Sequence, residues 1–396
     1  MSATLIARSP ALQRLQNEGY NLEIRNGSTG AFLLVHDVPY VTPRREVKRG
    51  TLVTPLELAG DTAATPVANH QAWFQGEHPC NPDGSEILQI KHSSQPVDYG
   101  GGLIVQHSFS AKLRTGNYPD YHAKMTRYID ILSGPARALE TEATARTFPP
   151  VLEDSQTSVF RYADTATSRA GIGTMSSKLA NQKIGIIGLG GTGAYVLDLV
   201  AKTHVAEIHL FDGDEFHQHN AFRAPGAAAV EEFGSKKVTY YSDLYGRMRH
   251  GLVPHPEYVT EENTDLLKKL DFVFACVDKP QARPTIFATL NAAGVPFIDV
   301  GMDVQSTSSG ELIGQCRVTL ATPSCNAHVN TLVSSSEGRA NDLYATDIQV
   351  ADLNALNATF AVIRWKKFNG FYGDQRREHH SVYIINTHGL TRDVVA

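Results

Sequence analysis

The chain has 396 residues, of which 42% are apolar, and its formal net charge is −5. This length suffices for roughly two or three globular domains. The mixed charges give no sign of a nucleic-acid or membrane partner. The N-terminus lacks the apolar core of a signal peptide, and no apolar run reaches the ~20 residues of a membrane span. Four cysteines without a CxxC pair favour a reducing, cytoplasmic setting.

The first third of the chain predicts a small α+β domain over residues 1–133. A helix is expected over 5–19, with Ser9 as its N-cap and Pro10 at its first position. Short strand-like runs follow, separated by turns rich in Gly, Pro, Asp and Asn, and residues 120–132 favour a second helix. Residues 134–158 have the composition of a linker.

The rest of the chain, residues 159–396, has the rhythm of an α/β domain. Strand and helix patterns alternate from residue 182, and antiparallel-looking strands follow residue 303. Strands are expected at 183–187, 207–211, 271–276 and 296–300, and helices up to 202 and at 235–248, 281–293 and 348–368. This pattern predicts a Rossmann-like domain with a mixed sheet and flanking helices.

The turn after the first of these strands is rich in glycine: Gly188, Gly190, Gly191 and Gly193 lie within six residues. Glycines let a backbone approach a nucleotide closely, and the following helix N-terminus favours phosphate charge. Asp212 lies at about the spacing of an NAD ribose ligand. The turn alone therefore fits an NAD enzyme as well as an ATP enzyme.

The segment after the second strand distinguishes the two. It carries Asp212-Gly213-Asp214 and then Asn220-Ala221-Phe222-Arg223, and Gly234-Ser235-Lys236-Lys237 follows. Asp278 appears at the end of the third strand, in Cys276-Val277-Asp278. Together with the glycine-rich turn, these motifs resemble the ThiF/MoeB/ubiquitin-activating-enzyme superfamily, which carries GxGGxG, D-x-D, N-x-x-R, G-x-x-K and a catalytic Asp in this order. The resemblance covers about residues 160–370.

The resemblance implies a role for each matching residue. Gly188, Gly190, Gly191 and Gly193 would approach ATP, and Asp212 would bind its ribose. The phosphates would be held by Asn220, Arg223 and Lys237, with Lys236 the alternative if the register slips by one. Asp278 would coordinate Mg²⁺, with help from Asp214. Arg283 fits a structural ion pair as well as a functional role.

Two further candidates follow from the same resemblance. Members of the family often act as homodimers in which an N-terminal arginine reaches the partner's nucleotide, and Arg169 is the candidate here. Cys325 lies in a polar loop near the place of the family's reactive cysteine, so it is the candidate for a thioester, with His328 beside it in sequence. No zinc site is expected, because the two CxxC pairs are absent.

The expected function is ATP-dependent adenylation of the C-terminal carboxylate of a ubiquitin-like protein, with possible transfer to Cys325. The order of domains resembles bacterial ThiF-type proteins with an extra N-terminal domain that accompany ubiquitin-like conjugation components. The N-terminal domain would then bind the ubiquitin-like protein or a conjugating-enzyme partner. Two alternatives are a non-catalytic scaffold that binds nucleotide and a ubiquitin-like tail, and an NAD-linked oxidoreductase.

Overall fold

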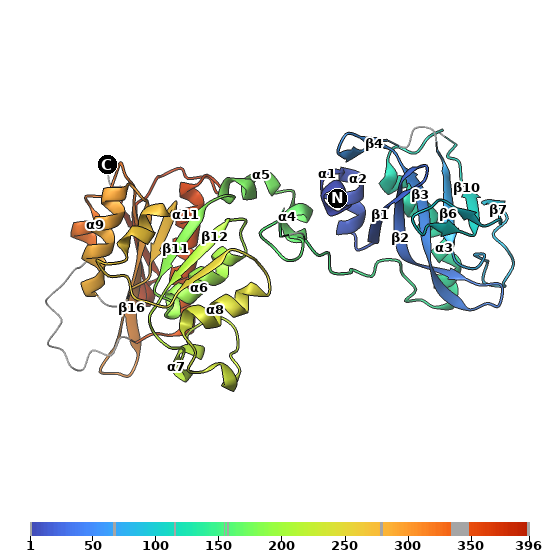
Figure 1. Ribbon diagram of the computed structural model, residues 1–396. Helices are drawn as coiled ribbons and strands as arrows, with labels where there is room; N and C mark the ends of the chain where they lie inside the picture. Colours follow the sequence, from blue (N-terminus) through green and yellow to red (C-terminus); the bar gives the residue numbers. More distant parts are fainter. Residues whose placement is uncertain are drawn as a thin grey trace. The chain divides into compact units, whose positions relative to one another are not determined.

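The structure is a computed structural model that describes residues 2–65, 69–114, 116–153, 155–156, 158–277, 280–333 and 348–393. It contains two compact units, which are labelled by their elements in Figure 1. Unit 1 comprises Met1–Val151 and Ser168–Ala170. Unit 2 comprises Leu152–Thr167 and Gly171–Ala396. Each unit has its own hydrophobic core.

Unit 1 is built on an antiparallel sheet. Its strands stand in the order β1 (Asn21–Gly27), β2 (Gly30–Val41), β3 (Val47–Leu56), β6 (Gln71–Gln75), β10 (His107–Ser110) and β7 (Lys91–Ser93). Two small ribbons pair β4 (Leu58–Ala59) with β5 (Thr62–Ala63) and β8 (Val97–Asp98) with β9 (Ile104–Val105). The helices of this unit are α1 (Ser2–Arg8), α2 (Pro10–Asn17) and α3 (Tyr121–Leu139).

Helix α3 covers one face of this sheet. It begins after Asp120, whose carboxylate accepts a hydrogen bond from the backbone N–H of Ala123 (2.7 Å). Its apolar stripe packs with Leu33 and Val35 of β2, whose neighbours along the strand point to the opposite face. The helix expected over 120–132 is confirmed, and it continues to Leu139 because the apolar stripe continues.

The start of the chain forms two helices where the sequence predicts one. Pro10 begins α2, as expected. Ser9 stands between the helices, but its hydroxyl donates to the Leu5 carbonyl (2.7 Å) and accepts from the Ala63 N–H (2.8 Å). Ser9 therefore ties α1 to the β5 ribbon, and it does not cap α2 with its side chain.

A lysine is buried beneath α3. Lys124 has no exposed surface, and its ammonium donates to Thr54 Oγ1 and to the Asn69 carbonyl, both at 2.7 Å. Burial disfavours the charged form and lowers the pKa of Lys124 to about 8. The protonation of this residue is therefore linked to the stability of unit 1.

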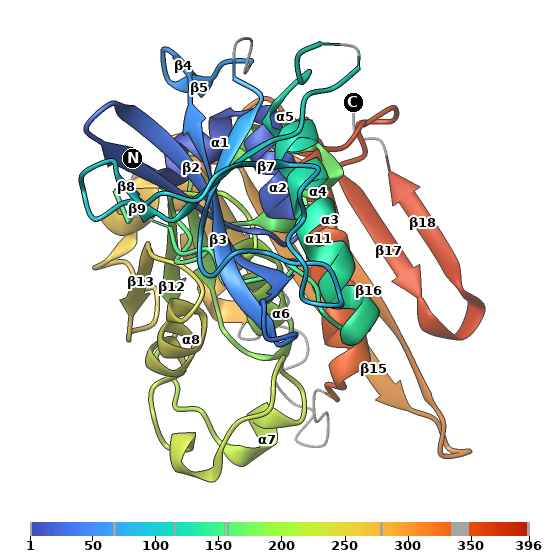
Figure 2. The same ribbon diagram turned by 90° about the vertical axis from the view of Figure 1, so that its right-hand side faces the viewer.

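Unit 2 is built on a mixed sheet. Its strands stand in the order β13 (Leu252–His255), β12 (Glu207–Phe211), β11 (Lys183–Ile187), β14 (Phe272–Ala275), β15 (Phe297–Ser306), β16 (Leu312–Ala321), β17 (His380–Ile384) and β18 (Gly389–Asp393). The first five strands are parallel, and the last three continue the sheet antiparallel. Figure 2 shows β16, β17 and β18 following one another at one side of the sheet.

Helices cover both faces of the unit 2 sheet. One face packs against α6 (Gly191–Ala201), α8 (Lys237–Gly246) and α11 (Ala351–Phe368), and the other against α9 (Arg283–Ala293) and α10 (Val329–Leu332). Both faces being covered explains why β11 and β14 are apolar almost throughout. Short helices complete the unit: α5 (Gly173–Ser176), α7 (Gln218–Ala221), η1 (Ser177–Leu179), η2 (Val230–Glu232), η3 (Thr264–Lys269), η4 (Pro280–Ala282) and η6 (Ile385–Thr387). The residues of α4 (Thr165–Ala170) are divided between the two units.

This architecture confirms the expected fold class, a Rossmann-like α/β domain with a mixed sheet and flanking helices that follows a smaller domain with helices and strands. The chain starts the sheet at β11, adds β12 and β13 on one side, and then adds β14 and β15 on the other. Ligands of open α/β sheets bind at such a reversal, outside the carboxyl ends of the strands. We therefore expect a ligand site at the loops after β11, β12 and β14.

Candidate active site

The turn after β11 is shaped by close contacts of its glycines. Gly188 has φ +88°, and a Cβ there would lie 2.5 Å from the Cys276 carbonyl oxygen. A Cβ on Gly193 would lie 1.9 Å from the Gly188 carbonyl oxygen, and one on Gly191 would lie 2.0 Å from the Asn354 side chain. Gly190 differs, because a Cβ there would meet no atom within 4 Å. Packing within the protein thus requires three of these glycines, while Gly190 leaves open space beside the backbone.

Asp212 joins the glycine-rich turn to the end of β12. Its carboxylate is 5% exposed and accepts hydrogen bonds from the backbone N–H groups of Leu189 (2.6 Å) and Asp214 (2.8 Å). Burial raises the pKa of Asp212 above its usual range, and the Lys237 ammonium 3.7 Å away opposes that shift. The carboxylate therefore fixes the two loops against each other at the carboxyl edge of the sheet.

Lys237 brings a positive charge to the same place. It opens α8, is 5% exposed, and its ammonium lies 2.8 Å from Asp214 Oδ2. The other oxygen of Asp214 accepts a hydrogen bond from the Tyr258 hydroxyl. Lys236 is exposed and donates to the Gly213 carbonyl (2.8 Å). Of the two adjacent lysines, Lys237 is the one that the structure joins to Asp212 and Asp214.

Asn220 and Arg223 lie on and just after the short helix α7. The Asn220 side-chain oxygen Oδ1 accepts a hydrogen bond from the His217 backbone N–H (2.8 Å), so this side chain holds the start of α7. The Arg223 Nε is buried and has no hydrogen-bond partner among the described residues. A buried donor without a partner is costly, and an anion would satisfy it.

Asn354, on α11, was not singled out from the sequence. It is fully buried, accepts a hydrogen bond from the Thr192 hydroxyl (2.9 Å), and donates to the Arg223 carbonyl (3.2 Å). It thereby links the glycine-rich turn to the α7 segment. The signal in the sequence was an asparagine on the apolar stripe of a helix, which requires a polar partner in the core.

Asp278 lies outside the described residues, but the segment that leads to it is anchored. The Arg283 guanidinium donates to the Val277 carbonyl (2.7 Å) and to Asp299 (3.1 Å). Asp299 is fully buried and also accepts from Arg317 (2.7 Å). Arg283 therefore forms a structural ion pair, which was one of its two expected roles. Asp299 and Arg317 were missed, although a carboxylate inside an apolar strand signals a buried partner.

Cys325 follows β16 and pairs with His328. Its Sγ lies 3.7 Å from His328 Nδ1, and His328 Nε2 lies 2.9 Å from the Leu320 carbonyl oxygen. Because a carbonyl only accepts, Nε2 carries a hydrogen, and in the neutral form of the ring the lone pair lies on Nδ1, which faces the sulfur. His328 is thus placed to accept the thiol proton of Cys325.

The strand register places Cys325 away from the glycine-rich turn. Ala321, at the end of β16, pairs with Phe297, the first residue of β15, whereas Ala275 at the end of β14 pairs with Asp299. The segment after β16 thus begins at the amino-terminal edge of the parallel strands. The glycine-rich turn lies at the carboxyl edge. The role of Cys325 in thioester formation stays a prediction that its position in this structure does not support.

Two of the other cysteines are surrounded by apolar side chains, and Arg169 lies in unit 1. Cys276 contacts the core, and burial raises the pKa of its thiol; burial also raises the pKa of Cys316 to about 11. Arg169 belongs to unit 1 and forms no ion pair with any described residue.

Within the described ranges, no group of three or more His, Cys, Asp or Glu side chains could hold a metal ion. No helix in those ranges has the length and apolar character needed to cross a bilayer.

Comparison with known proteins separates the two parts of the chain. The ThiF family matches residues 165–342, and a domain of unknown function, DUF6791, matches residues 10–165. The adenylyltransferase and sulfurtransferase uba4 of Emericella nidulans is 30% identical over 128 residues, which are 31% of this chain and 26% of that protein. The match thus spans about a quarter of the relative's length.

The similarity to solved structures is lower. E. coli MccB, crystallised with MccA-N7isoASN, is 17% identical with a TM-score of 0.47, over 55% of this chain and 65% of MccB. Selenomethionine-labelled PaaA is 15% identical with a TM-score of 0.45, over 56% of this chain and 75% of PaaA. The family match over residues 165–342 and the order of the motifs support placing this part of the chain in the ThiF/MoeB/ubiquitin-activating-enzyme superfamily.

Proposed function

We propose that unit 2 uses ATP to adenylate the C-terminal carboxylate of a ubiquitin-like protein. The observation that carries the proposal is the buried Lys237 ammonium beside Asp212 and Asp214, at the carboxyl edge of the sheet and next to the glycine-rich turn. A positive group held at that edge suits the phosphates of a nucleotide. The ThiF family match and the likeness to an adenylyltransferase support the same reaction.

Adenylation of a carboxylate requires stabilisation of negative charge more than it requires proton transfer. A carboxylate is ionised at neutral pH and attacks the α-phosphorus directly; an O–P bond forms, and the bond to pyrophosphate breaks with its electron pair on the leaving oxygen. The barrier comes from repulsion between anions and from charge that develops on pyrophosphate. Positioning and fixed positive charge therefore supply the catalysis.

The residues divide these tasks by their surroundings. Asp212 is held rigidly by two backbone N–H groups and would face the ribose hydroxyls. Arg223 and Lys237 would contact the phosphates, and the unpartnered Nε of Arg223 supports this. Asn220 stands at the start of the segment that carries Arg223. The open space at Gly190 would admit the nucleotide close to the backbone.

A magnesium ion belongs to the same proposal. Bound Mg²⁺ would neutralise charge on the phosphates, and carboxylate oxygens are suitable ligands. Asp214 fits in chemistry and is 44% exposed at its side chain, although Lys237 and Tyr258 both donate to it here. Asp278, the other proposed ligand, lies outside the described residues.

Transfer to Cys325 is the second half of the proposal. The thiolate would attack the acyl carbon, a C–S bond would form, and AMP would leave with the electron pair of the C–O bond. His328 Nδ1 would take the thiol proton. Because Cys325 lies toward the other edge of the sheet, this step requires it to change position relative to the glycine-rich turn.

The oligomeric state, the protein partners and the cellular setting are part of the same proposal. They comprise pairing with a second copy, in which Arg169 reaches the partner's nucleotide, a conjugating-enzyme partner, and a cytoplasmic bacterial conjugation system. The NAD alternative gives no role to the cluster of Lys237 with two carboxylates.

ATP–pyrophosphate exchange with a ubiquitin-like protein encoded beside this chain tests the proposal. Wild type and Lys236→Ala should catalyse exchange, whereas Lys237→Ala and Asp278→Ala should not. Lys236 is the matched control, because it neighbours Lys237 in sequence but is exposed. The ubiquitin-like protein without its last residues should support no exchange with any variant.

The same samples separate the alternatives. A thiol-sensitive adduct on wild type that is absent from Cys325→Ala would assign the thioester, and its presence on both would remove Cys325 from the mechanism. ATP binding without exchange in every sample would favour the scaffold. Exchange by Lys237→Ala at the wild-type rate would contradict the site described here.

A further inference from the structure

Unit 1 contains a hollow of about 500 Å³ that lies outside the candidate active site. It is lined by α2, by residues 146 and 148 after α3, and by residues 168 and 169. Three arginines, Arg14, Arg146 and Arg169, surround it together with one acid, Glu18. An exposed aromatic ring, Phe148, completes one side.

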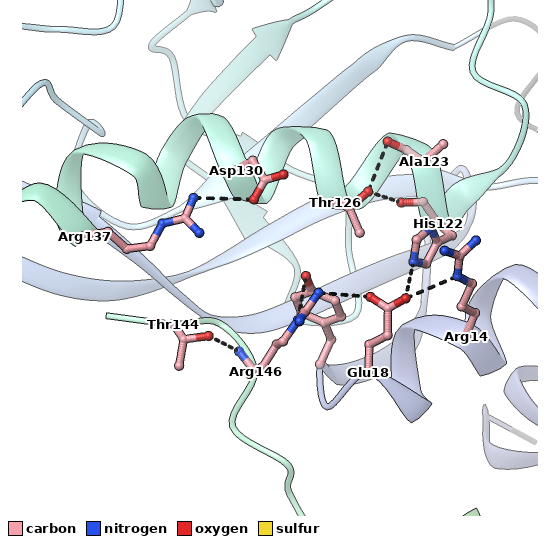
Figure 3. Close-up of polar contacts among 10 residues, drawn as sticks. Arg14, Glu18, His122, Ala123, Thr126, Asp130, Arg137, Thr144 and Arg146 are labelled. Atoms are coloured by element: carbon pink, nitrogen blue, oxygen red, sulfur yellow. Dashed lines mark hydrogen bonds and ion pairs between the residues drawn. The ribbon is translucent and has the colours of Figure 1, made fainter. Parts of the chain in front are cut away.

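Glu18 organises the charged side of the hollow. Its two carboxylate oxygens accept from Arg14 Nε (3.2 Å), from Arg146 (3.2 Å) and from His122 Nε2 (2.9 Å), as Figure 3 shows. Burial alone would raise the pKa of Glu18, but the hydrogen bond from His122 and the two guanidiniums outweigh it and lower the pKa. Glu18 is therefore ionised at neutral pH, and it holds the two guanidiniums in fixed directions.

The arginines keep binding capacity after this arrangement. Arg14 uses only Nε in its bond to Glu18, and Arg146 uses Nε on the Tyr20 hydroxyl (3.3 Å) and one terminal nitrogen on Glu18. No described residue accepts from Arg169. Three positive charges against one negative charge leave two in excess. Guanidiniums with open terminal nitrogens match carboxylates or phosphates.

Phe148 is held in a strained conformation beside these charges. Its φ is +49°, in the left-handed region that bulky side chains rarely adopt. The backbone N–H of Phe148 donates a hydrogen bond to the Gly19 carbonyl (2.9 Å), which holds the residue in this conformation. The Phe148 ring occupies the space that a Cβ of Gly19 would need. The ring is nevertheless 61% exposed. Residues with a strained backbone cluster at ligand-binding sites, so the conformation of Phe148 fits a binding role for the hollow.

We infer that this hollow binds an acidic peptide segment of a partner protein, with carboxylates on the arginines and an apolar side chain against Phe148. Charge complementarity selects an anionic partner. Two peptide carboxylates, one on each of two guanidiniums, would balance the two positive charges in excess. The inference rests on unit 1 alone and does not require adenylation by unit 2.

Binding of a defined peptide to the full chain tests the inference. The probe is a fluorescent heptapeptide in which aspartate and phenylalanine alternate, and its matched control carries asparagine for aspartate. We expect saturable binding of the acidic probe that weakens with added salt, and about tenfold weaker binding or more for Arg14→Gln and for Arg146→Gln. Arg137→Gln should bind as wild type, because Arg137 is similarly exposed (50% against 51%) and pairs with Asp130 outside the hollow.

A second variant separates binding from folding. Phe148→Gly relieves the positive φ, so its melting temperature should equal or exceed that of wild type, while probe binding weakens at least about fivefold. Equal binding of the asparagine peptide, equal loss in Arg137→Gln, or no saturable binding to wild type would overturn the inference. Stronger competition by inorganic phosphate than by acetate would overturn the choice of carboxylate. None of these readouts uses ATP, so they are independent of the exchange assay.

Discussion

The glycine-rich turn permits a test that separates the fold of unit 2 from nucleotide binding. Gly190 and Gly193 lie three residues apart in one turn, but their surroundings differ. A Cβ at Gly193 would stand 1.9 Å from the Gly188 carbonyl oxygen, which is backbone and cannot move aside alone. A Cβ at Gly190 would meet nothing within 4 Å, and the backbone of Gly190 (φ −69°, ψ −157°) is accessible to alanine.

The two alanine variants should therefore behave in opposite ways. Gly193→Ala should destabilise unit 2 by about 3 kcal/mol or more, since it forces a backbone shift in a packed turn. For a domain of this size that lowers the melting temperature by roughly 6–12 °C. Gly190→Ala should change stability by less than about 1 kcal/mol, because the lost N-cap preference and the lower entropy of the unfolded chain nearly cancel.

Nucleotide binding should reverse that order of severity. A methyl group at Gly190 stands where the proposed ATP would approach the backbone, so Gly190→Ala should weaken ATP binding at least about tenfold, a change of about 1.4 kcal/mol. Thermal unfolding and titration with a fluorescent ATP analogue measure both quantities. Wild-type affinity in Gly190→Ala would refute the placement of the nucleotide. A wild-type melting temperature in Gly193→Ala would refute the packing argument.

Three further predictions concern a buried lysine, a buried aspartate and the reactivity of the cysteines. The pKa of Lys124 is about 8 in the folded protein and lies below its ordinary 10.5, so the unfolded chain binds the proton more tightly. The free energy of unfolding, measured with urea, should therefore rise by about 2 kcal/mol from pH 8 to pH 9.5. An equal rise in Lys124→Met would contradict this prediction. Asp299→Asn should lower the free energy of unfolding of unit 2 by about 3 kcal/mol, since it leaves the Arg283 and Arg317 guanidiniums without their buried carboxylate. An unchanged midpoint of urea unfolding would count against this ion-pair network. Iodoacetamide at pH 7.5 should modify Cys325 before Cys276 and Cys316, and His328→Gln should slow the modification of Cys325. Equal rates for the three thiols, measured by mass spectrometry, would argue against the pairing of Cys325 with His328.

Much of unit 2 could be predicted from local sequence. The strands expected at 183–187 and 207–211 form with those bounds, and the helix expected over 348–368 forms over Ala351–Phe368. Apolar runs that end in Gly or Asp define such elements without knowledge of the rest of the chain. The order of the motifs likewise indicated the superfamily. These features depend on residues that are close together in the sequence.

Contacts between distant segments could not be predicted in this way. Asn354 binds Thr192 across a separation of 162 residues, and Arg146 binds Glu18 across 128. The edge of the sheet to which Cys325 belongs follows from the pairing of β16 with β15, not from the polar character of its loop. The sequence determined the elements and the chemistry of the glycine-rich turn, because backbone preference and apolar periodicity act locally. The tertiary structure alone decided which side chains meet, because that depends on how the helices pack and how the strands are ordered.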